Sequence, residues 1–379
     1  MKSLACIILL FLSSELVAQT EIEGLVVDGE TNTPLPGANV YIANTTKGVS
    51  TDAEGRFRIS GLRPVPYELV VSFIGYQTAA VNITPRKGVI YRVVLRQSAR
   101  QLHEIVVRAK KLSRIKRATY LRVFTEHFIG KSDNALRCKF INTKVLSLDK
   151  EGDVIIASTD STLILVNRGL GYRVKIDLET YKYNTFRNAI HYEGHMVYER
   201  LVPSSKHQAR RWAINRLKAY YGSPMHFFRA LYNRKANEEG YYFYFVQPFQ
   251  SDTVVRVRSK LFNNQRLKIA ALKDYDQIID SVHSTKELPV LNFSGPLEIS
   301  YLHEGESVVF QRTQRVRVRK ALQISQIKLR APATVLPDGR VTPVSAAEIG
   351  GYWSWELMSE NLPLDYEPDE DLAIINRTN

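Results

Sequence analysis

The sequence predicts a mainly β protein with two folded parts, a small antiparallel sandwich and a larger β-rich α+β domain with a central pair of helices. Short runs in which apolar and polar residues alternate begin at Glu21. Turn-forming residues break these runs at close intervals, as in a compact antiparallel sheet. After Ser205 the apolar period changes to that of a helix, and strand-like patterns resume later in the chain.

The first residues have the organisation of a secretory signal peptide. Lys2 precedes an apolar run from Leu4 to Leu12, and small residues follow up to Ala18. The apolar run is too short to span a bilayer as a helix, and no later run reaches the roughly 20 apolar residues that such a helix needs. We therefore expect residues 1–18 to be removed and the protein to be exported, with a periplasmic or outer-membrane-associated location and no transmembrane helix.

The sandwich is predicted from alternating strands and one tight turn. Apolar residues alternate at residues 38–42 and again at 69–73, so each run places one face in a core. Between them, Asp52 and Gly55 are the residue types of a tight turn, and we expect a hairpin there. A last alternating strand at residues 89–95 completes the sandwich, for which we expect the bounds 19–97.

These residues also resemble a known family. The matching positions are Gly24, Val26 and Asp28, Pro34-Leu35-Pro36-Gly37-Ala38-Asn39-Val40, Gly48, Thr51-Asp52, Gly55-Arg56-Phe57 and Ile74-Gly75-Tyr76. In this order they are similar to the carboxypeptidase regulatory-like domains of envelope proteins from Bacteroidota. The resemblance implies a seven-stranded immunoglobulin-like or transthyretin-like sandwich. It also implies a docking or glycan-binding-like role rather than catalysis.

A basic linker is predicted at residues 98–122. Its residues 102–107, Leu-His-Glu-Ile-Val-Val, resemble the energy-coupling segment of TonB-dependent receptors. An extended linker is the simpler interpretation, because too few residues follow for the plug and large barrel of such a receptor.

Residues 123–366 are the predicted α+β domain, to which we assign no function from the sequence. Strand-like runs at residues 154–157, 163–166 and 172–178 are expected to form a meander. Later strand-like runs lie at residues 241–246, 254–257, 266–272 and 314–319.

The helix pair lies at the centre of this domain. Ala213 and Leu217 belong to an apolar stripe at helical spacing, and Gly222 is suited to end that helix. Ser223 and Pro224 are typical of the cap and the first residue of a second helix. We expect the pair to pack its aromatic residues on the preceding sheet.

The C-terminal region is expected to contain a hairpin turn, a short helix and a polar tail. The turn is predicted at residues 337–339, Pro-Asp-Gly, and the helix at residues 350–362. Residues 367–379 are the predicted tail. This domain resembles the C-terminal region of uncharacterised Bacteroidota proteins with the same two-part build. That resemblance rests on Leu170-Gly171-Tyr172, Trp212, Asn215-Arg216, Ala219-Tyr220-Tyr221-Gly222-Ser223, His226-Phe227, Arg229 and the stretch from Trp353 to Tyr366.

The formal charge of +14 is concentrated at residues 108–122 and 206–235, which favours an anionic partner. In an exported protein, the partner expected is an envelope protein, a glycan or an anionic lipid surface, and not nucleic acid. The candidate surface consists of Arg210, Arg211, Arg216, Lys218 and Arg229. The candidate pocket consists of Trp212, Asn215, Tyr220 and His226.

No complete catalytic or metal-binding motif is found in the sequence. A zinc carboxypeptidase needs His-x-x-Glu and a later histidine, but no histidine follows His303 and Glu306, which we expect to be exposed loop residues. His191 and His195 have a spacing that two metal ligands can have, but β-type residues surround them. Nucleophile-elbow, phosphate-loop and dinucleotide motifs are absent, so we predict no catalytic residue, metal or cofactor.

Three functions remain open from the sequence. The first is a non-enzymatic exported envelope protein whose sandwich docks and whose second domain binds a partner or an anionic surface. The second is an envelope hydrolase with a site assembled in the second domain, which convergent polar groups around His226, Arg229 or Asn215 would favour. The third is a small outer-membrane β-barrel formed by the second domain.

Overall fold

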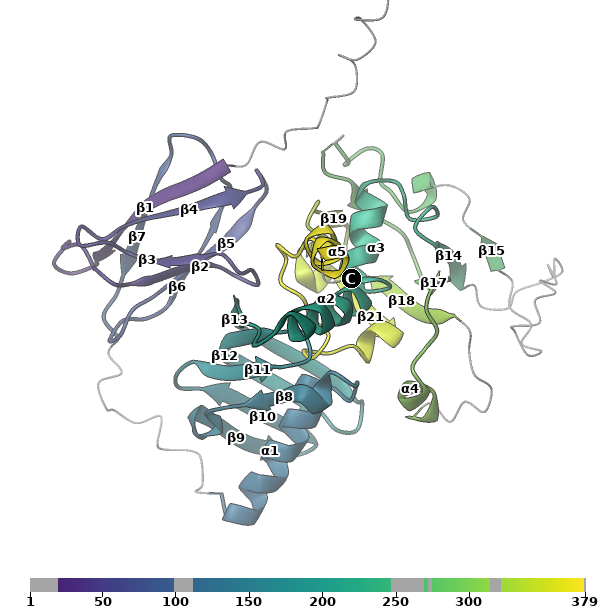
Figure 1. The fold of residues 1–379 in the computed structure, drawn as a ribbon, viewed down its shortest axis with the longest axis horizontal. Coiled ribbons are helices and arrows are strands. Elements are labelled where there is room, and N and C mark those ends of the chain that lie inside the picture. Colours follow the sequence, from purple (N-terminus) through teal and green to yellow (C-terminus); the bar gives the residue numbers. More distant parts are fainter. Residues whose placement is uncertain are drawn as a thin grey trace, which may run out of the picture. The chain divides into compact units, whose positions relative to one another are not determined.

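The computed structural model describes residues 20–98, 112–246, 269–271, 275–285, 287–313 and 322–377 (Figure 1). The chain divides into two compact units. The sandwich unit comprises Met1–Ala43 and Lys47–Val106, and the second unit comprises Asn44–Thr46 and Val107–Asn379. The fold is mainly β, as predicted. The expected signal peptide and the segment at residues 102–107 lie outside the described residues.

The sandwich unit has the seven strands that were expected, in two sheets ordered β4-β1-β7 and β3-β2-β5-β6. The strands are β1 (Thr20–Asp28), β2 (Asn39–Ile42), β3 (Gly48–Ser50), β4 (Arg56–Leu62), β5 (Tyr67–Ser72), β6 (Ala79–Ile83) and β7 (Ile90–Leu95). Val40 and Ile42 of β2 and Leu69 and Val71 of β5 are fully buried, so both predicted alternations face the core.

The turn predicted at Asp52 and Gly55 is present, but the expected hairpin is wrong. The Asp52 carboxylate accepts the backbone N–H groups of Glu54 at 3.1 Å and Arg56 at 2.7 Å. Gly55 has φ 72°, and a Cβ there would lie 2.7 Å from the carbonyl oxygen of Val26. The strands that flank this turn do not pair, because β3 pairs with β2 in one sheet while β4 pairs with β1 in the other. The turn therefore carries the chain from one sheet to the other.

The first sheet of the second unit contains six strands and is covered by a helix. The strands are β8 (Cys138–Phe140), β9 (Leu146–Glu151), β10 (Val154–Thr159), β11 (Leu163–Asn167), β12 (Tyr172–Asn184) and β13 (Ala189–Arg200). Helix α1 (Arg114–Ile129) packs against β9 and β10 (Figure 1). It buries Phe124 and Phe128 in the core of this sheet. Short 3₁₀ turns occur at η2 (Ala135–Arg137) and η3 (Thr143–Val145).

The expected meander is wrong at one connection. β10 and β11 do not pair with each other, although both pair with β12. β11 pairs with Tyr172–Ile176 and β10 with Tyr181–Asn184, while β13 pairs with β12 along nearly its whole length. β10 and β11 therefore lie end to end along one edge of the long strand β12. The sequence pattern did not predict that β12 would be long enough to pair with both.

The helix pair forms where it was predicted. Helix α2 (Lys206–Tyr220) is capped by the Ser205 hydroxyl, which accepts the N–H of Gln208 at 3.1 Å. Helix α3 (Pro224–Tyr232) is capped by Ser223 and has proline at its first position. The expected packing on the preceding sheet is found for α2, whereas α3 adds only Met225 to that core and buries Phe227 and Phe228 in the core of the following sheet.

The following sheet has five strands, ordered β15-β14-β17-β18-β21, and a smaller sheet is ordered β16-β19-β20. The strands are β14 (Tyr241–Val246), β15 (Ile269–Ala271), β16 (Val290–Leu291), β17 (Pro296–Tyr301), β18 (Gln323–Leu329), β19 (Ala333–Val335), β20 (Val341–Thr342) and β21 (Ala347–Gly351). Helix α4 (Val308–Thr313) and the 3₁₀ turns η4 (Tyr275–Gln277) and η5 (Val344–Ala346) connect them. The hairpin turn predicted at residues 337–339 joins β19 to β20. The strands expected at 254–257 and 314–319 lie outside the described residues.

Two C-terminal expectations are wrong. In place of a helix over residues 350–362, only the 3₁₀ turn η6 (Tyr352–Ser354) forms, and Trp353 is held in the core by donating to the carbonyl oxygen of Gly222 at 2.6 Å. In place of a polar tail, helix α5 (Pro368–Arg377) forms and packs against α2. No helix in the described part of the chain is both long and apolar enough to cross a bilayer.

Candidate functional site

The five predicted cations do not form one surface. Arg211 and Lys218 of α2 are exposed, and Arg210 of α2 is half-buried. Arg211 and Lys218 are seven residues apart, so they lie on the same face of α2, two turns apart. The two remaining cations, Arg216 and Arg229, are enclosed by the second unit. The predicted surface is therefore corrected by removing these two residues from it.

Arg216 is committed to internal contacts with Asp371 and Leu170. Its Nε donates to the Asp371 carboxylate at 2.8 Å, its Nη2 binds the other oxygen of that carboxylate, and its Nη1 donates to the carbonyl oxygen of Leu170 at 2.9 Å. The side chains of Arg216 and Asp371 are 13% and 3% exposed. The Tyr366 hydroxyl also donates to Asp371, at 2.9 Å. Arg216 therefore joins α2 to α5 and is not available to an external anion.

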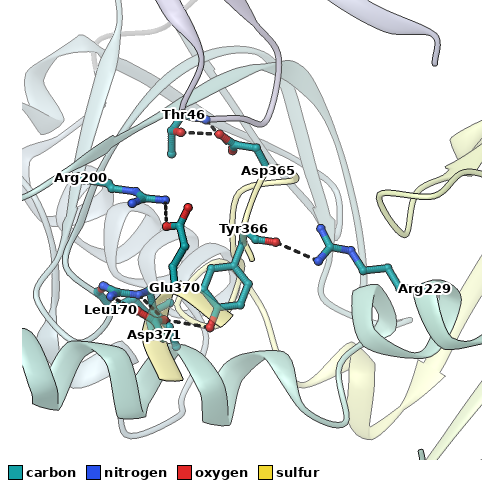
Figure 2. A network of polar contacts seen from close by, with 9 residues as sticks. Thr46, Leu170, Arg200, Arg229, Asp365, Tyr366, Glu370 and Asp371 are labelled. Atoms are coloured by element: carbon teal, nitrogen blue, oxygen red, sulfur yellow. Dashed lines mark hydrogen bonds and ion pairs between the residues drawn. The ribbon is translucent and has the colours of Figure 1, made fainter. Parts of the chain in front are cut away.

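Arg229 is committed to backbone oxygens. It donates to the carbonyl oxygens of Asp338 at 3.1 Å, Tyr366 at 2.8 Å and Leu364 at 2.9 Å, and it is 7% exposed. Its guanidinium also lies over the ring of Tyr220, 5.6 Å from the centroid. Arg229 thus fixes the segment that leads into α5, which Figure 2 shows for the contact with Tyr366.

The predicted pocket residues Trp212 and Asn215 anchor α2 to a loop of the first sheet. Trp212 Nε1 donates to the carbonyl oxygen of Arg168 at 2.8 Å, and Asn215 Nδ2 donates to that of Gly169 at 2.8 Å. The Trp212 ring lies so close to Gly171 that a Cβ there would be 2.6 Å from it. These two side chains are therefore packed inside the second unit.

His226 lies at the centre of a saturated hydrogen-bond network. Its Nδ1 accepts the backbone N–H of Gly222 at 3.1 Å and the Tyr241 hydroxyl at 2.8 Å, so the ring proton is on Nε2, which donates to Glu239 at 2.6 Å. Burial and the nearby Arg229 lower the pKa of His226 to about 4, and the residue is 2% exposed. Because both nitrogens are engaged, a neutral His226 supports the fold and has no nitrogen free for a substrate proton.

The histidines and glutamate considered as metal ligands occupy separate places. His191 and His195 lie on β13, where His191 Nε2 is 3.2 Å from Glu193 and His195 Nε2 is 3.5 Å from Glu179. His303 is exposed, as expected, whereas Glu306 is buried at 4% exposure, contrary to expectation. Within the described ranges, no group of three or more His, Cys, Asp or Glu side chains could hold a metal ion.

A cavity that the sequence did not predict lies within the second unit. It encloses about 320 Å³ between α1, β13, β21 and the segment after β21. Phe128, Tyr192 and Trp353 contribute aromatic walls, and Ile190, Ile349 and Met358 contribute apolar ones. His127, Glu356 and Asn361 are polar residues of the lining. Its volume lies at the lower end of the range of small-molecule sites.

The ionisable groups of the cavity are held mostly neutral. Burial, with repulsion from Glu360 and Glu304, raises the pKa of Glu356 well above its ordinary range. Burial lowers the pKa of His127, whose ring stacks on Tyr183 with centroids 3.8 Å apart. These residues come from α1 and from the segment after β21, so only the folded chain brings them together.

The comparisons with known proteins concern the sandwich unit. Residues 22–107 match the CarboxypepD_reg-like domain, which confirms the resemblance found in the sequence. TonB-dependent receptor P39 of Formosa agariphila is 39% identical over 110 residues, which are 28% of this chain and 10% of the receptor. TonB-dependent receptor SusC of Bacteroides thetaiotaomicron is 37% identical over 99 residues, which are 26% of this chain and 9% of the receptor. The chain thus matches about a tenth of the length of these Bacteroidota relatives, and the matched domain is a non-catalytic sandwich.

Similarity to solved structures is weaker. A streptococcal ancillary pilin is 26% identical, with 22% of this chain and 30% of the pilin covered at a TM-score of 0.19. A putative carbohydrate-binding protein from Bacteroides uniformis is 12% identical, with 41% of this chain and 57% of that protein covered at a TM-score of 0.18. At such TM-scores, no property of these proteins is transferred to this chain.

Proposed function

We propose that this chain is a non-enzymatic, exported protein of the cell envelope. The sandwich unit acts as a docking or glycan-binding-like module, and the exposed cations of α2 contact a partner or an anionic envelope surface. The observation that carries the proposal is the match of residues 22–107, because the relatives that share this domain are receptors and the domain itself is non-catalytic. Location in the periplasm or at the outer membrane is part of the same proposal.

The basic surface is narrower than the five residues predicted from the sequence. Arg211 and Lys218 supply two exposed charges on one face of α2, and the half-buried Arg210 lies beside Arg211 in sequence. Arg216 and Arg229 are excluded because their guanidinium groups already bind internal oxygens. An envelope hydrolase centred on His226 has little support, since both ring nitrogens are already engaged.

Two measurements test the proposal with the full chain. The first expresses a C-terminally tagged protein in a Bacteroidota host and follows it through cell fractionation. We expect recovery in the periplasm or the outer-membrane fraction, and retention in the cytoplasm would refute the proposed location.

The second measurement is co-sedimentation of the purified protein with vesicles of phosphatidylcholine containing phosphatidylglycerol. We expect binding that weakens as salt is added and falls at least fivefold in the double variant Arg211→Gln/Lys218→Gln. The matched control is Lys139→Gln/Lys150→Gln, which removes the same charge from exposed positions on β8 and β9. Equal losses in both variants would show a net-charge effect and would reject the α2 surface.

A further inference from the structure

Three polar side chains line the cavity of the second unit without a hydrogen-bond partner. They are His127, Glu356 and Asn361, all half-buried, and no hydrogen bond to another described residue engages the imidazole, the carboxyl or the amide. Polar groups enclosed in a protein are nearly always hydrogen-bonded, to the protein, to water or to a ligand. Because these three residues are half-buried, water can satisfy their polar groups in the empty cavity, and the polar group of a ligand can take the place of that water.

The electrostatics of the cavity favour a cation. Glu356 is partly buried, and repulsion from Glu304 and Glu360 reaches its carboxyl. Glu360 itself accepts hydrogen bonds from Ser132 and Asn134, and Asn134 Nδ2 is 2.7 Å from its Oε2. His127 is the only basic side chain among the residues that line the described cavity, and its lowered pKa keeps it neutral at pH 7. A cation in the cavity would therefore meet no competing positive charge from the lining, and it would favour the ionised form of Glu356, whose carboxyl is mostly neutral when the cavity is empty.

The walls favour an organic cation over a metal ion. Tyr192 lies edge-on to Phe128, with ring centroids 5.7 Å apart, and Trp353 adds a third aromatic surface. Aromatic rings attract an organic cation through their negatively charged faces. A hard metal ion requires several oxygen ligands, and in the described residues no group of three or more potential ligand side chains could hold one.

The acceptors among the lining residues match the donors of a primary ammonium group. An ionised Glu356 carboxylate, the Asn361 amide oxygen and a neutral His127 nitrogen are three acceptors, and a primary ammonium has three N–H donors. We infer that the cavity enclosed by α1, β13 and the segment after β21 binds a small organic molecule with a primary ammonium group and an apolar body. The inference does not depend on the proposed envelope location, because it rests only on the second unit.

The test uses the full chain and benzylammonium as the probe. Its affinity is measured by isothermal titration calorimetry and compared with that of benzyl alcohol, which has the same ring without the charge. We expect saturable binding of benzylammonium and at least tenfold weaker binding of benzyl alcohol. Equal affinity of the two probes would overturn the inference and leave an apolar cavity without preference for a cation.

Two variants place the binding in the cavity. Glu356→Gln keeps the shape and removes the charge, so benzylammonium binding should weaken at least tenfold, whereas Glu151→Gln, on the exposed surface of β9, should bind like the wild type. Ile349→Trp, at a position that lines the cavity and is 41% exposed, should block binding without changing a charge. Circular-dichroism melting confirms that each variant is folded. Undiminished binding in folded Glu356→Gln or Ile349→Trp, or no saturable binding to the wild type, would refute the site.

Discussion

Asp28 is a buried carboxylate at the end of β1 that four hydrogen bonds hold in place. It accepts the backbone N–H groups of Glu30 at 2.7 Å and Thr31 at 2.8 Å, the Tyr76 hydroxyl at 2.5 Å and Gln97 Nε2 at 3.1 Å. These bonds, that from Tyr76 foremost, lower the pKa of Asp28 far below its ordinary value of 3.8. Asp28 and Tyr76 were both part of the family resemblance, and the structure brings them into direct contact.

The first prediction concerns Asp28→Asn, which removes the charge but keeps the size. Because the folded-state pKa is depressed, the carboxylate stabilises the fold above its unfolded pKa near 3.8, and this stability is lost as pH falls towards the folded-state value. Asp28→Asn should therefore be less stable than the wild type at pH 7, and the difference should shrink as pH falls below about 4. Urea unfolding from pH 7 to pH 2 measures this. Asp52→Asn, in an exposed turn, is the control, and an equal effect there would contradict the prediction.

The pKa of Glu304 is shifted in the opposite direction to that of Asp28. Burial, with repulsion from Glu360, raises its pKa from 4.5 to about 7. A carboxyl whose folded-state pKa is raised binds its proton more tightly when folded, so stability decreases as pH rises from 4.5 to about 7. The cluster of Glu304, Glu356 and Glu360 is therefore a strained feature of the second unit at neutral pH.

The second prediction follows for Glu304→Gln. The variant should be more stable than the wild type by about 1–3 kcal/mol at pH 8, because it cannot ionise, and nearly equal to it at pH 5. Chemical unfolding at the two pH values provides the measurement. A variant that is less stable at both would show that the carboxyl makes a favourable contact that outweighs repulsion.

At the scale of elements, α5 is attached to the rest of the second unit by two ion pairs of different character. Arg216 and Asp371 form a pair with side chains 13% and 3% exposed. Arg200 and Glu370 form a pair at 2.7 Å with side chains 54% and 52% exposed. Only the first pair is shielded from water, so the two should contribute unequally to stability.

The third prediction compares one variant from each pair. Asp371→Asn leaves the Arg216 guanidinium buried without its counter-ion and should destabilise the protein by about 3–5 kcal/mol. Arg200→Gln breaks the exposed pair and should change stability by less than about 1 kcal/mol. Urea unfolding of both variants under the same conditions measures their free energies of unfolding. Similar losses of stability in the two variants would contradict the assigned difference in shielding.

Elements with local signals were predictable, and those fixed by distant contacts were not. The helix pair was predicted because Ser205, Ser223 and Pro224 are adjacent to the helices that they start. Helix α5 was mistaken for a polar tail because Asp371, which reads as a solvated acid, has its partner Arg216 on α2, far away in the sequence. The passage of the chain from one sheet to the other at the turn that begins at Asp52 was not predicted for a similar reason. A turn motif does not specify which strands pair.

At the scale of the whole molecule, the same limit explains why the cavity was not predicted. His127, Tyr192 and Glu356 belong to three segments that are separated in the sequence, and none carries a spacing motif. The composition showed excess positive charge, whereas the residues that line the cavity include a glutamate and no lysine or arginine, so average charge gave no indication of it. The predicted site residues Arg216, Trp212 and His226 proved to hold α2 and α3 in place.

The separation of the cores leads to the last prediction. The core of the sandwich unit includes Ile42, that of the first sheet of the second unit includes Leu165, and the clusters of buried residues share no member. Ile42→Ala leaves a void at a fully buried position and should destabilise its own core by about 2–5 kcal/mol. In the full chain, hydrogen exchange should then accelerate in β2 and β5 while β12 and β13 keep their protection, and Leu165→Ala should give the reverse. Equal loss of protection in both units after either substitution would mean that the two units open as one cooperative unit despite their separate cores.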